Sequence, residues 1–258
     1  MRKVRKKGVI RFWSGNRSAS RRAFEREVLR AVIECIPYES GYWEIEEDPS
    51  DVPGETEAQV FVDKTHDLLV TVGGNPKFDT KDTIVIPQPL DFGMLGSRLL
   101  IIRKEDAADF GAIRDKAGLQ HKVQGIPLSW ADATIFRANG FAVKEEGRVD
   151  DLLQRLAGRQ FDYTTFGALE VLQLFEPEQP GLSALMIEDT LLLQYEMPLL
   201  FYVRSDRPHI AALIEKGLKV ISNSGLLRDV LQKHFGGMAA KLQLGQRKKI
   251  ELRNPLFP

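Results

Sequence analysis

Apolar residues are concentrated in two stretches that lie far apart in the chain. Residues 92–103 (FGMLGSRLLIIR) and 197–204 (MPLLFYVR) are apolar runs bounded by Gly, Pro and charged residues, which is typical of buried strands. The segment between them is long enough to form a compact α/β unit of its own. We therefore predict that the chain leaves a first lobe near Arg103, builds a second lobe, and returns near Pro198.

The amino-terminal part alternates between strand and helix patterns. Strands are predicted at 9–13, 42–46 and 68–72, separated by an amphipathic helix over 20–36 and a short helix over 56–64. The longer helix has apolar residues at intervals of three and four, with Ser18 or Ser20 as its N-cap. Strands alternating with helices predict a parallel sheet with right-handed crossovers.

Polar loops follow the first and third of these strands. In sheets of this kind ligands bind beyond the carboxyl ends of the strands. Trp13 and Ser14 end the first strand, and Gly74 and Asn75 follow the third. Such glycines can also serve tight turns alone, but their occurrence at two equivalent strand ends favours a ligand site.

The segment between the crossings repeats this pattern. After a short strand at 121–124, Ser129 is expected to cap a helix that has Asp132 in its first turn. The free N–H groups of a helix start favour a carboxylate or phosphate, and Asp132 opposes a strongly anionic ligand there. A helix over 150–156, a strand beginning near Tyr163 and a helix over 164–175 follow.

Two closing helices, 208–222 and 225–235, are expected to pack on the first lobe. The predicted division is therefore 1–102 with 199–258 for lobe 1 and 103–198 for lobe 2. The fold class is α/β, with two lobes joined by a hinge that the chain crosses twice.

Composition excludes several classes of protein. Of the 258 residues, 43% are hydrophobic and 28% charged, which excludes a disordered chain and a membrane channel. Lys plus Arg equals Asp plus Glu at 36 each, so charge gives no argument for nucleic-acid binding. One Cys and four dispersed His predict no intrachain disulfide and no metal site. No cofactor motif is present. No secretory signal is visible, because Arg11 interrupts the apolar run after MRKVRKK.

Four segments follow one another along the chain: VIRFWSG, LLQRLAGRQFDYTTFGALEV, MPLLFYVRSDRP and IEKGLKVISNSGLLRDVLQKHF. In their order and spacing they resemble the motifs of type 2 periplasmic solute-binding proteins, in particular the amino-acid-binding group of bacterial ABC importers. The resemblance implies two mixed sheets flanked by helices, a ligand cleft between two lobes, and a periplasmic or extracytoplasmic location. A second-lobe loop, GIPLSWADATIFRANGF, resembles a less studied branch of the same family.

The sequence departs from the amino-acid-binding pattern at two positions. The family usually has an arginine shortly after the third strand, to hold the ligand carboxylate as a bidentate fork. Here GGNPKFDTKDTIVIP contains none, and Lys77 or Lys81 could supply only a point charge. The family's second-lobe aspartate, which holds an α-amino group, has no clear counterpart near Tyr163.

The leading hypothesis is a protein that binds a small polar organic solute without chemistry, as a monomer that delivers to a membrane permease. Core packing is the alternative role for its tryptophans. A sensor domain of the same fold is a second hypothesis. A third is an enzyme such as a dehydratase, with Asp132 or Glu170 as the acid. The predicted ligand contacts are Trp13, Ser14, Gly74, Asn75, Lys77, Ser129, Trp130, Asp132, Tyr163 and Thr165.

Overall fold

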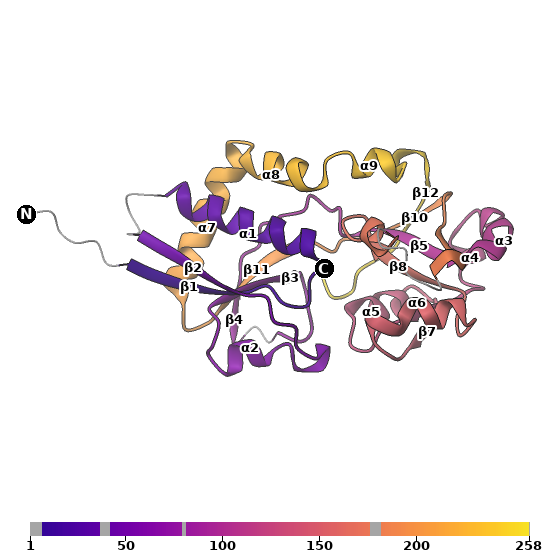
Figure 1. Ribbon diagram of the computed structural model, residues 1–258, viewed down its shortest axis with the longest axis horizontal. Helices are drawn as coiled ribbons and strands as arrows, with labels where there is room; N and C mark the ends of the chain where they lie inside the picture. The colour runs from indigo at the N-terminus through magenta and orange to yellow at the C-terminus, as the bar shows by residue number, and fades with distance from the viewer. Residues whose placement is uncertain (1–6, 37–41, 79–80, 176–181, 258) are drawn as a thin grey trace, which may run out of the picture. The chain divides into compact units, whose positions relative to one another are not determined.

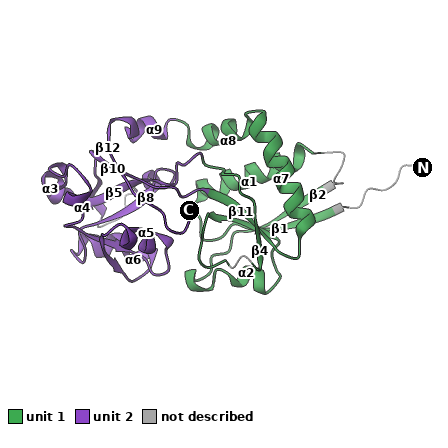
Figure 2. Ribbon diagram, turned by 180° about the vertical axis from the view of Figure 1, so that it is seen from behind, with its two compact units in different colours: residues 1–91, 199–236 green, residues 92–198, 237–258 purple. Residues whose placement is uncertain are grey.

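The computed structural model describes residues 7–36, 42–78, 81–175 and 182–257. The chain divides into two compact units (Figure 2). Unit 1 comprises residues 1–91 and 199–236, and unit 2 comprises residues 92–198 and 237–258. The chain therefore passes between the units after Asp91, after Pro198 and after Gly236, which is one passage more than the predicted two.

Unit 1 is built on a mixed five-stranded sheet in the order β2-β1-β3-β11-β4. Its parallel strands are β1 (Lys7–Trp13), β2 (Tyr42–Asp48) and β3 (Leu68–Val72). The returning strand β11 (Leu199–Arg204) is antiparallel to β3 and to β4 (Thr83–Val85). Because β1, β2 and β3 are parallel, their carboxyl ends meet at one edge of the sheet.

The helices of unit 1 form as the apolar spacing predicts. α1 (Ala19–Glu34), α7 (Pro208–Asn223) and α8 (Leu226–Phe235) pack together (Figure 1), whereas the short α2 (Gln59–Val62) lies across the sheet from them. The Ser18 side chain accepts a hydrogen bond from the Arg21 N–H, so that Ser18, and not Ser20, is the N-cap of α1. The helix in this region is shorter than the predicted range of 56–64. Gly54–Thr56 forms a 3-10 turn, and only Gln59–Val62 is α-helical.

Unit 2 contains a seven-stranded mixed sheet. Six strands follow the order β12-β10-β5-β8-β6-β7, and β9 pairs with β5. The strands are β5 (Ser97–Arg103), β6 (Val123–Ile126), β7 (Ala142–Glu145), β8 (Tyr163–Gly167), β9 (Leu185–Ile187), β10 (Leu191–Gln194) and β12 (Lys248–Glu251). The helices are α3 (Ala107–Gly111), α4 (Lys116–Leu119), α5 (Ala131–Ala138), α6 (Val149–Ala157) and α9 (Met238–Lys241). Short 3-10 helices occupy Lys104–Asp106, Val171–Phe175, Leu182–Ala184 and Leu244–Gln246. Two mixed sheets flanked by helices confirm the predicted fold class.

The predicted helix over 164–175 differs from the structure. Residues 163–167 form β8, every residue of which is buried, and only Val171–Phe175 is helical, as a 3-10 turn. Two consecutive β-branched threonines favour the strand, and its pairing with β5 places them inside the sheet.

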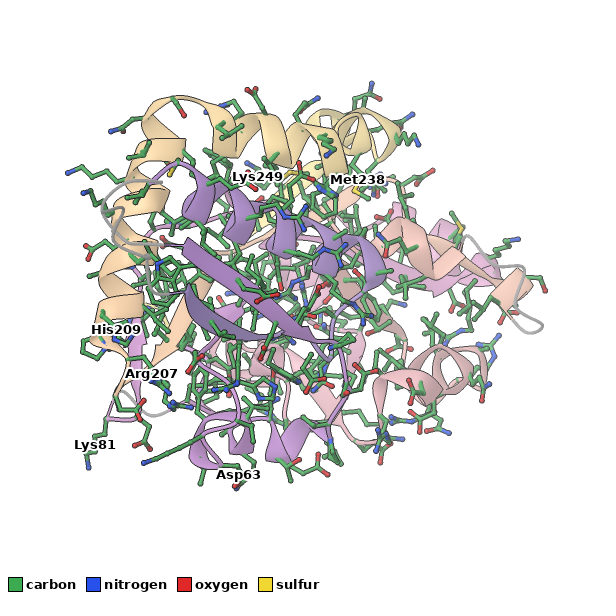
Figure 3. All side chains as sticks on the ribbon, turned by 60° about the vertical axis from the view of Figure 1, so that its left-hand side comes forward. Asp63, Lys81, Arg207, His209, Met238 and Lys249 are labelled. Atoms are coloured by element: carbon green, nitrogen blue, oxygen red, sulfur yellow. The ribbon has the colours of Figure 1, made fainter. Side chains whose placement is uncertain are left out.

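The carboxyl-terminal segment belongs to unit 2, whereas the sequence placed it in lobe 1. β12 pairs with β10 in parallel, and Ile250 and Leu252 are buried. Met238 and Lys249, labelled in Figure 3, mark this segment. Residues 92–102 also belong to unit 2, because β5 is a central strand of its sheet. Strand pairing between residues distant in sequence decides both assignments.

Asn139, at the end of α5, holds the carboxyl-terminal segment in place. Its amide donates to the Ile135 and Arg253 carbonyl oxygens at 2.8 and 2.7 Å, and its oxygen accepts from the Arg253 N–H at 3.1 Å. Asn139→Ala is expected to lower the free energy of unfolding by about 1–3 kcal/mol, because one buried and two part-buried hydrogen bonds to the backbone are lost. Urea unfolding measures this loss. The exposed Asn223 provides the control, and an equal effect of Asn223→Ala would contradict the assignment.

Candidate functional site

The carboxyl edge of unit 1 is formed by the loops after β1 and β3. Trp13 is 1% exposed, its indole N–H donates to the Ser50 carbonyl at 3.0 Å, and the Arg17 guanidinium lies 5.3 Å from its ring centroid. The structure thus places Trp13 in the core of unit 1, the alternative that the sequence left open. Its ring offers no exposed face to a solute.

The polar residues at this edge bond within unit 1. The Ser14 hydroxyl donates to Glu47 Oε1 at 2.7 Å. The Asn75 amide donates to the Thr71 hydroxyl at 2.9 Å, and Asn75 Oδ1 accepts from the Lys77 N–H at 3.1 Å. Gly74 has φ +71°, a left-handed turn that glycine adopts without strain. These bonds shape the loop.

A buried ion network lies beside this loop. Glu57 contacts Arg17 Nη2 at 3.3 Å and Lys77 Nζ at 2.9 Å. Arg17 also donates to the Val70 carbonyl at 2.7 Å, and its side chain is 6% exposed. Burial by itself raises the pKa of Glu57, but the charges of Arg17 and Lys77 outweigh it and lower the pKa below its ordinary value. Sequence reasoning found Lys77 but missed Arg17 and Glu57.

The carboxyl edge of unit 2 brings together the loops after β6 and β7, the start of α5 and one end of β5. β6 and β8 are parallel, and Arg98 of the antiparallel β5 pairs with Gly167, the last residue of β8. Arg98 therefore lies at the same edge as the carboxyl ends of β6 and β8. This placement follows only from the strand order.

Ser129 does not cap α5, contrary to the prediction. Trp130 occupies the N-cap position, while Ser129 has φ +67° and its N–H donates to Glu145 Oε1 at 3.2 Å. Trp130 is half-buried and meets the Phe166 ring edge-on, with centroids 5.7 Å apart. The sequence therefore located the start of the helix within two residues but assigned the wrong capping residue.

Asp132 forms a buried ion pair with Arg98 and accepts a hydrogen bond from the Tyr195 hydroxyl at 2.6 Å. The side chains of Arg98 and Asp132 are 3% and 8% exposed. Burial acts to lower the pKa of Arg98, but the carboxylate of Asp132 outweighs it and raises the pKa above its ordinary value. The carboxylate of Asp132 thus neutralises the buried charge of Arg98. Sequence reasoning missed Arg98 because it lies 34 residues away.

Tyr163 and Thr165 point into the core of unit 2. Tyr163 is 0% exposed and its ring packs edge-on against Phe110 at 5.9 Å. Thr165 is 2% exposed and its hydroxyl accepts from the Gln124 amide at 2.9 Å. The structure brings Trp130 and Ser129 to the carboxyl edge, but Tyr163 lies inside the sheet packing. Burial, followed by the charge of Asp162, raises the pKa of Tyr163 well above its ordinary value.

Two buried tyrosines allow a matched test of this placement. Among the described residues the Tyr163 hydroxyl has no hydrogen-bond partner, whereas the Tyr202 hydroxyl donates to the Val72 carbonyl at 3.0 Å. Tyr163→Phe is expected to raise the free energy of unfolding by about 1 kcal/mol, and Tyr202→Phe to lower it by about 0.5–1.5 kcal/mol. Denaturant titration of both variants measures the two signs. A loss for Tyr163→Phe equal to that for Tyr202→Phe would contradict the placement.

Several solved structures that are similar to this chain are described as amino-acid-binding or substrate-binding proteins. A probable amino-acid ABC transporter extracellular-binding protein, ytmK from Bacillus subtilis, aligns with a TM-score of 0.65 at 11% identity, over 90% of this chain and 99% of that one. An ancestral arginine-binding protein bound to arginine aligns with a TM-score of 0.61 at 15% identity, over 89% and 99%. An ancestral amino acid-binding protein, described as a precursor of cyclohexadienyl dehydratase, aligns with a TM-score of 0.61 at 13% identity, over 88% and 96%.

These similarities establish that the chain has the type 2 periplasmic-binding fold. Neither a family model nor a curated protein matches the sequence. In the part of the chain that the structure describes, no helix is long and apolar enough to cross a membrane. The same residues contain no group of three or more His, Cys, Asp or Glu that could hold a metal ion.

Proposed function

We propose that this protein captures a small organic solute and delivers it, outside the cytoplasm, to an ABC-type importer. The observation that carries the proposal is the fold. The chain aligns over about nine-tenths of its length with proteins described as substrate-binding or extracellular-binding proteins of amino-acid ABC transporters. Sheets of this α/β kind place ligands at their carboxyl edges. At the carboxyl edge of unit 2 the proposed contacts are Ser129 and Trp130. At the carboxyl edge of unit 1 they are Lys77 and the backbone at Gly74.

The state of Asp132, one of the two acidic candidates, agrees with a binding function. An enzyme such as a dehydratase needs a carboxylic acid with a raised pKa that faces its substrate. Asp132 is occupied by Arg98 and Tyr195 instead. One structural neighbour is described as a dehydratase precursor, and it is itself an amino acid-binding protein. We therefore propose that the protein binds its solute and does not catalyse a reaction on it.

Thermal unfolding in the presence of candidate solutes tests the proposal. The panel contains amino acids, organic acids, short peptides and polyamines, each at millimolar concentration. A solute at a hundred times its Kd stabilises the native state by about 2.7 kcal/mol, which raises the Tm of a chain of this size by a few degrees. Isothermal titration of each hit gives the Kd. Absence of any shift across the panel contradicts the proposal.

The partner is tested separately from the solute. An importer would require that the loaded protein bind a membrane permease, whereas a sensor domain would require that it bind a signalling receptor. Pull-down from detergent-solubilised membranes with and without a confirmed solute, followed by identification of the retained membrane protein, separates these two roles. If the pull-down retains a signalling receptor and no permease, the protein is a sensor domain and does not serve an importer.

A further inference from the structure

We infer that relative movement of the two units is carried mainly by the backbone at Gly93 and Gly237, and only to a small extent by the return of the chain at 196–199. The chain passes between the units three times, and these residues lie at the passages. Two observations support the inference: the backbone conformation at the first and third passages, and the hydrogen bonds that hold the second.

The first passage contains two consecutive residues in a left-handed backbone conformation. Phe92 has φ +49° and is 50% exposed, and Gly93 has φ +80°. Such a φ is an outlier for a bulky residue, whereas glycine adopts it without strain. Apart from its chain neighbours, no described residue has an atom within 4 Å of the point where a Cβ of Gly93 would lie. The backbone can therefore change direction at Gly93 without displacing packed atoms.

The third passage consists of Gly236 and Gly237, which join α8 to α9. Both flanking segments are anchored. In unit 1, Phe235 is 3% exposed and packs edge-on against Phe24, with ring centroids 5.4 Å apart, and in unit 2 Leu242 is 3% exposed in the core. Gly237 has φ +79°, and the position of its Cβ is likewise clear of other described atoms within 4 Å. A change in the separation of the two anchors is therefore taken up first at these glycines.

The second passage, by contrast, is held on both sides. Within unit 1 the Leu199 N–H donates to Asp91 Oδ1 at 3.0 Å. Within unit 2 the Asn254 amide donates to the Glu196 carbonyl oxygen at 2.7 Å. The ring of Pro198, between these two bonds, fixes its own φ. This passage acts as the pivot, where small changes of backbone angle suffice. Hinges elsewhere are a few loop or element-terminal residues that absorb large changes in φ and ψ, as Gly93 and Gly237 can.

Gly225 provides a matched control inside unit 1. It has φ +85°, and its Cβ position is equally open among the described residues. Its N–H donates to the Ser222 carbonyl at 3.2 Å, and its carbonyl oxygen accepts from the Asp229 N–H at 3.1 Å. The helices α7 and α8 of one unit thus fix its conformation, so that movement between the units cannot relieve strain there.

Distances between two spin labels, one on each unit, test the inference. Cys35, the single cysteine, is first replaced by serine. The labels are then attached to Lys219→Cys on α7 and Gln154→Cys on α6, two exposed positions. Electron–electron double resonance on the full chain, without a solute, gives the distribution of distances. Alanine in place of a left-handed glycine disfavours that conformation by about 5- to 30-fold, the equivalent of about 1–2 kcal/mol.

We expect Gly93→Ala and Gly237→Ala each to shift the distance distribution, because the passage relaxes to a negative φ and the units move with it. Their unfolding equilibrium constants in urea should stay close to that of the labelled parent. Gly225→Ala should give the reverse pattern. Its distance distribution should be unchanged, and its unfolding equilibrium constant should rise by about 5- to 30-fold, because the strain stays within unit 1.

Three results would overturn the inference. In the first, Gly93→Ala and Gly237→Ala leave the distances unchanged and lose as much stability as Gly225→Ala. In the second, only one of the two variants shifts the distances, which overturns the assignment of the other passage. In the third, Pro198→Ala shifts them as much as the glycine variants, which places the hinge at the second passage. The labels report movement without a solute, so each of these results leaves the solute-binding function to be decided by the solute panel.

Discussion

Replacing Asp132 by alanine is expected to lower the free energy of unfolding by about 3–5 kcal/mol. The Arg98 guanidinium would remain in the core of unit 2, with only 3% of its side chain exposed, and would lose the carboxylate with which it is paired. The Tyr195 hydroxyl would lose its acceptor as well. Urea unfolding followed by circular dichroism measures the change, which is a substantial fraction of the roughly 5–15 kcal/mol by which an ordinary domain is stable.

Two further variants test whether the loss of stability comes from the Arg98–Asp132 ion pair or from the removal of any carboxylate. Asp150→Ala removes a carboxylate that is 81% exposed on α6 and should change stability by less than about 0.5 kcal/mol. The double variant Arg98→Met, Asp132→Leu removes both buried charges and should recover most of the loss, because apolar residues of similar volume replace a buried pair well. A double variant as unstable as Asp132→Ala would show that the ion pair is not the cause.

Glu57→Gln is expected to cost about 3–5 kcal/mol at neutral pH, because Arg17 would stay buried without its counter-charge. The pKa of Glu57 is lowered in the folded state. Its contribution is therefore fully present above the unfolded pKa of about 4.3 and is lost as the pH falls through the folded value. The difference in stability between the wild type and the variant should shrink steadily below about pH 4.

Chemical unfolding at several pH values between about 3 and 7 measures this convergence. Glu55→Gln is the matched control, because Glu55 lies in the same 3-10 turn region and is exposed. The stability of the Glu55→Gln variant should equal that of the wild type at every pH. A constant difference between the wild type and Glu57→Gln down to the lowest pH would mean that Glu57 does not titrate as the network requires.

Local patterns in the sequence were sufficient to predict much of unit 1. The spacing of apolar residues predicted α1, and the run at 68–72 matches β3 residue for residue. A strand is recognisable when its residues are continuously apolar, and a helix when one face is apolar, since both signals lie within a short window. The fold class followed from the order of such elements.

The candidate site was predicted less well, because burial and pairing depend on residues that are distant in the chain. Trp13 and Tyr163 lie in cores that include strands from elsewhere in the sequence. Ser129 and Trp130 were located correctly as the start of a helix, but the backbone conformation at Ser129 shifted the cap by one residue.

By itself, the sequence determined the alternation of strands and helices, the return of the chain after Pro198, and the loops at the ends of the first strands. The tertiary structure alone decided the pairing of Arg17 with Glu57 and of Arg98 with Asp132, and it assigned residues 237–258 to unit 2. Secondary structure follows periodicities of two and 3.6 residues, which the chain displays locally. The partner of a buried charge or an edge strand is selected by long-range packing, which no local period encodes.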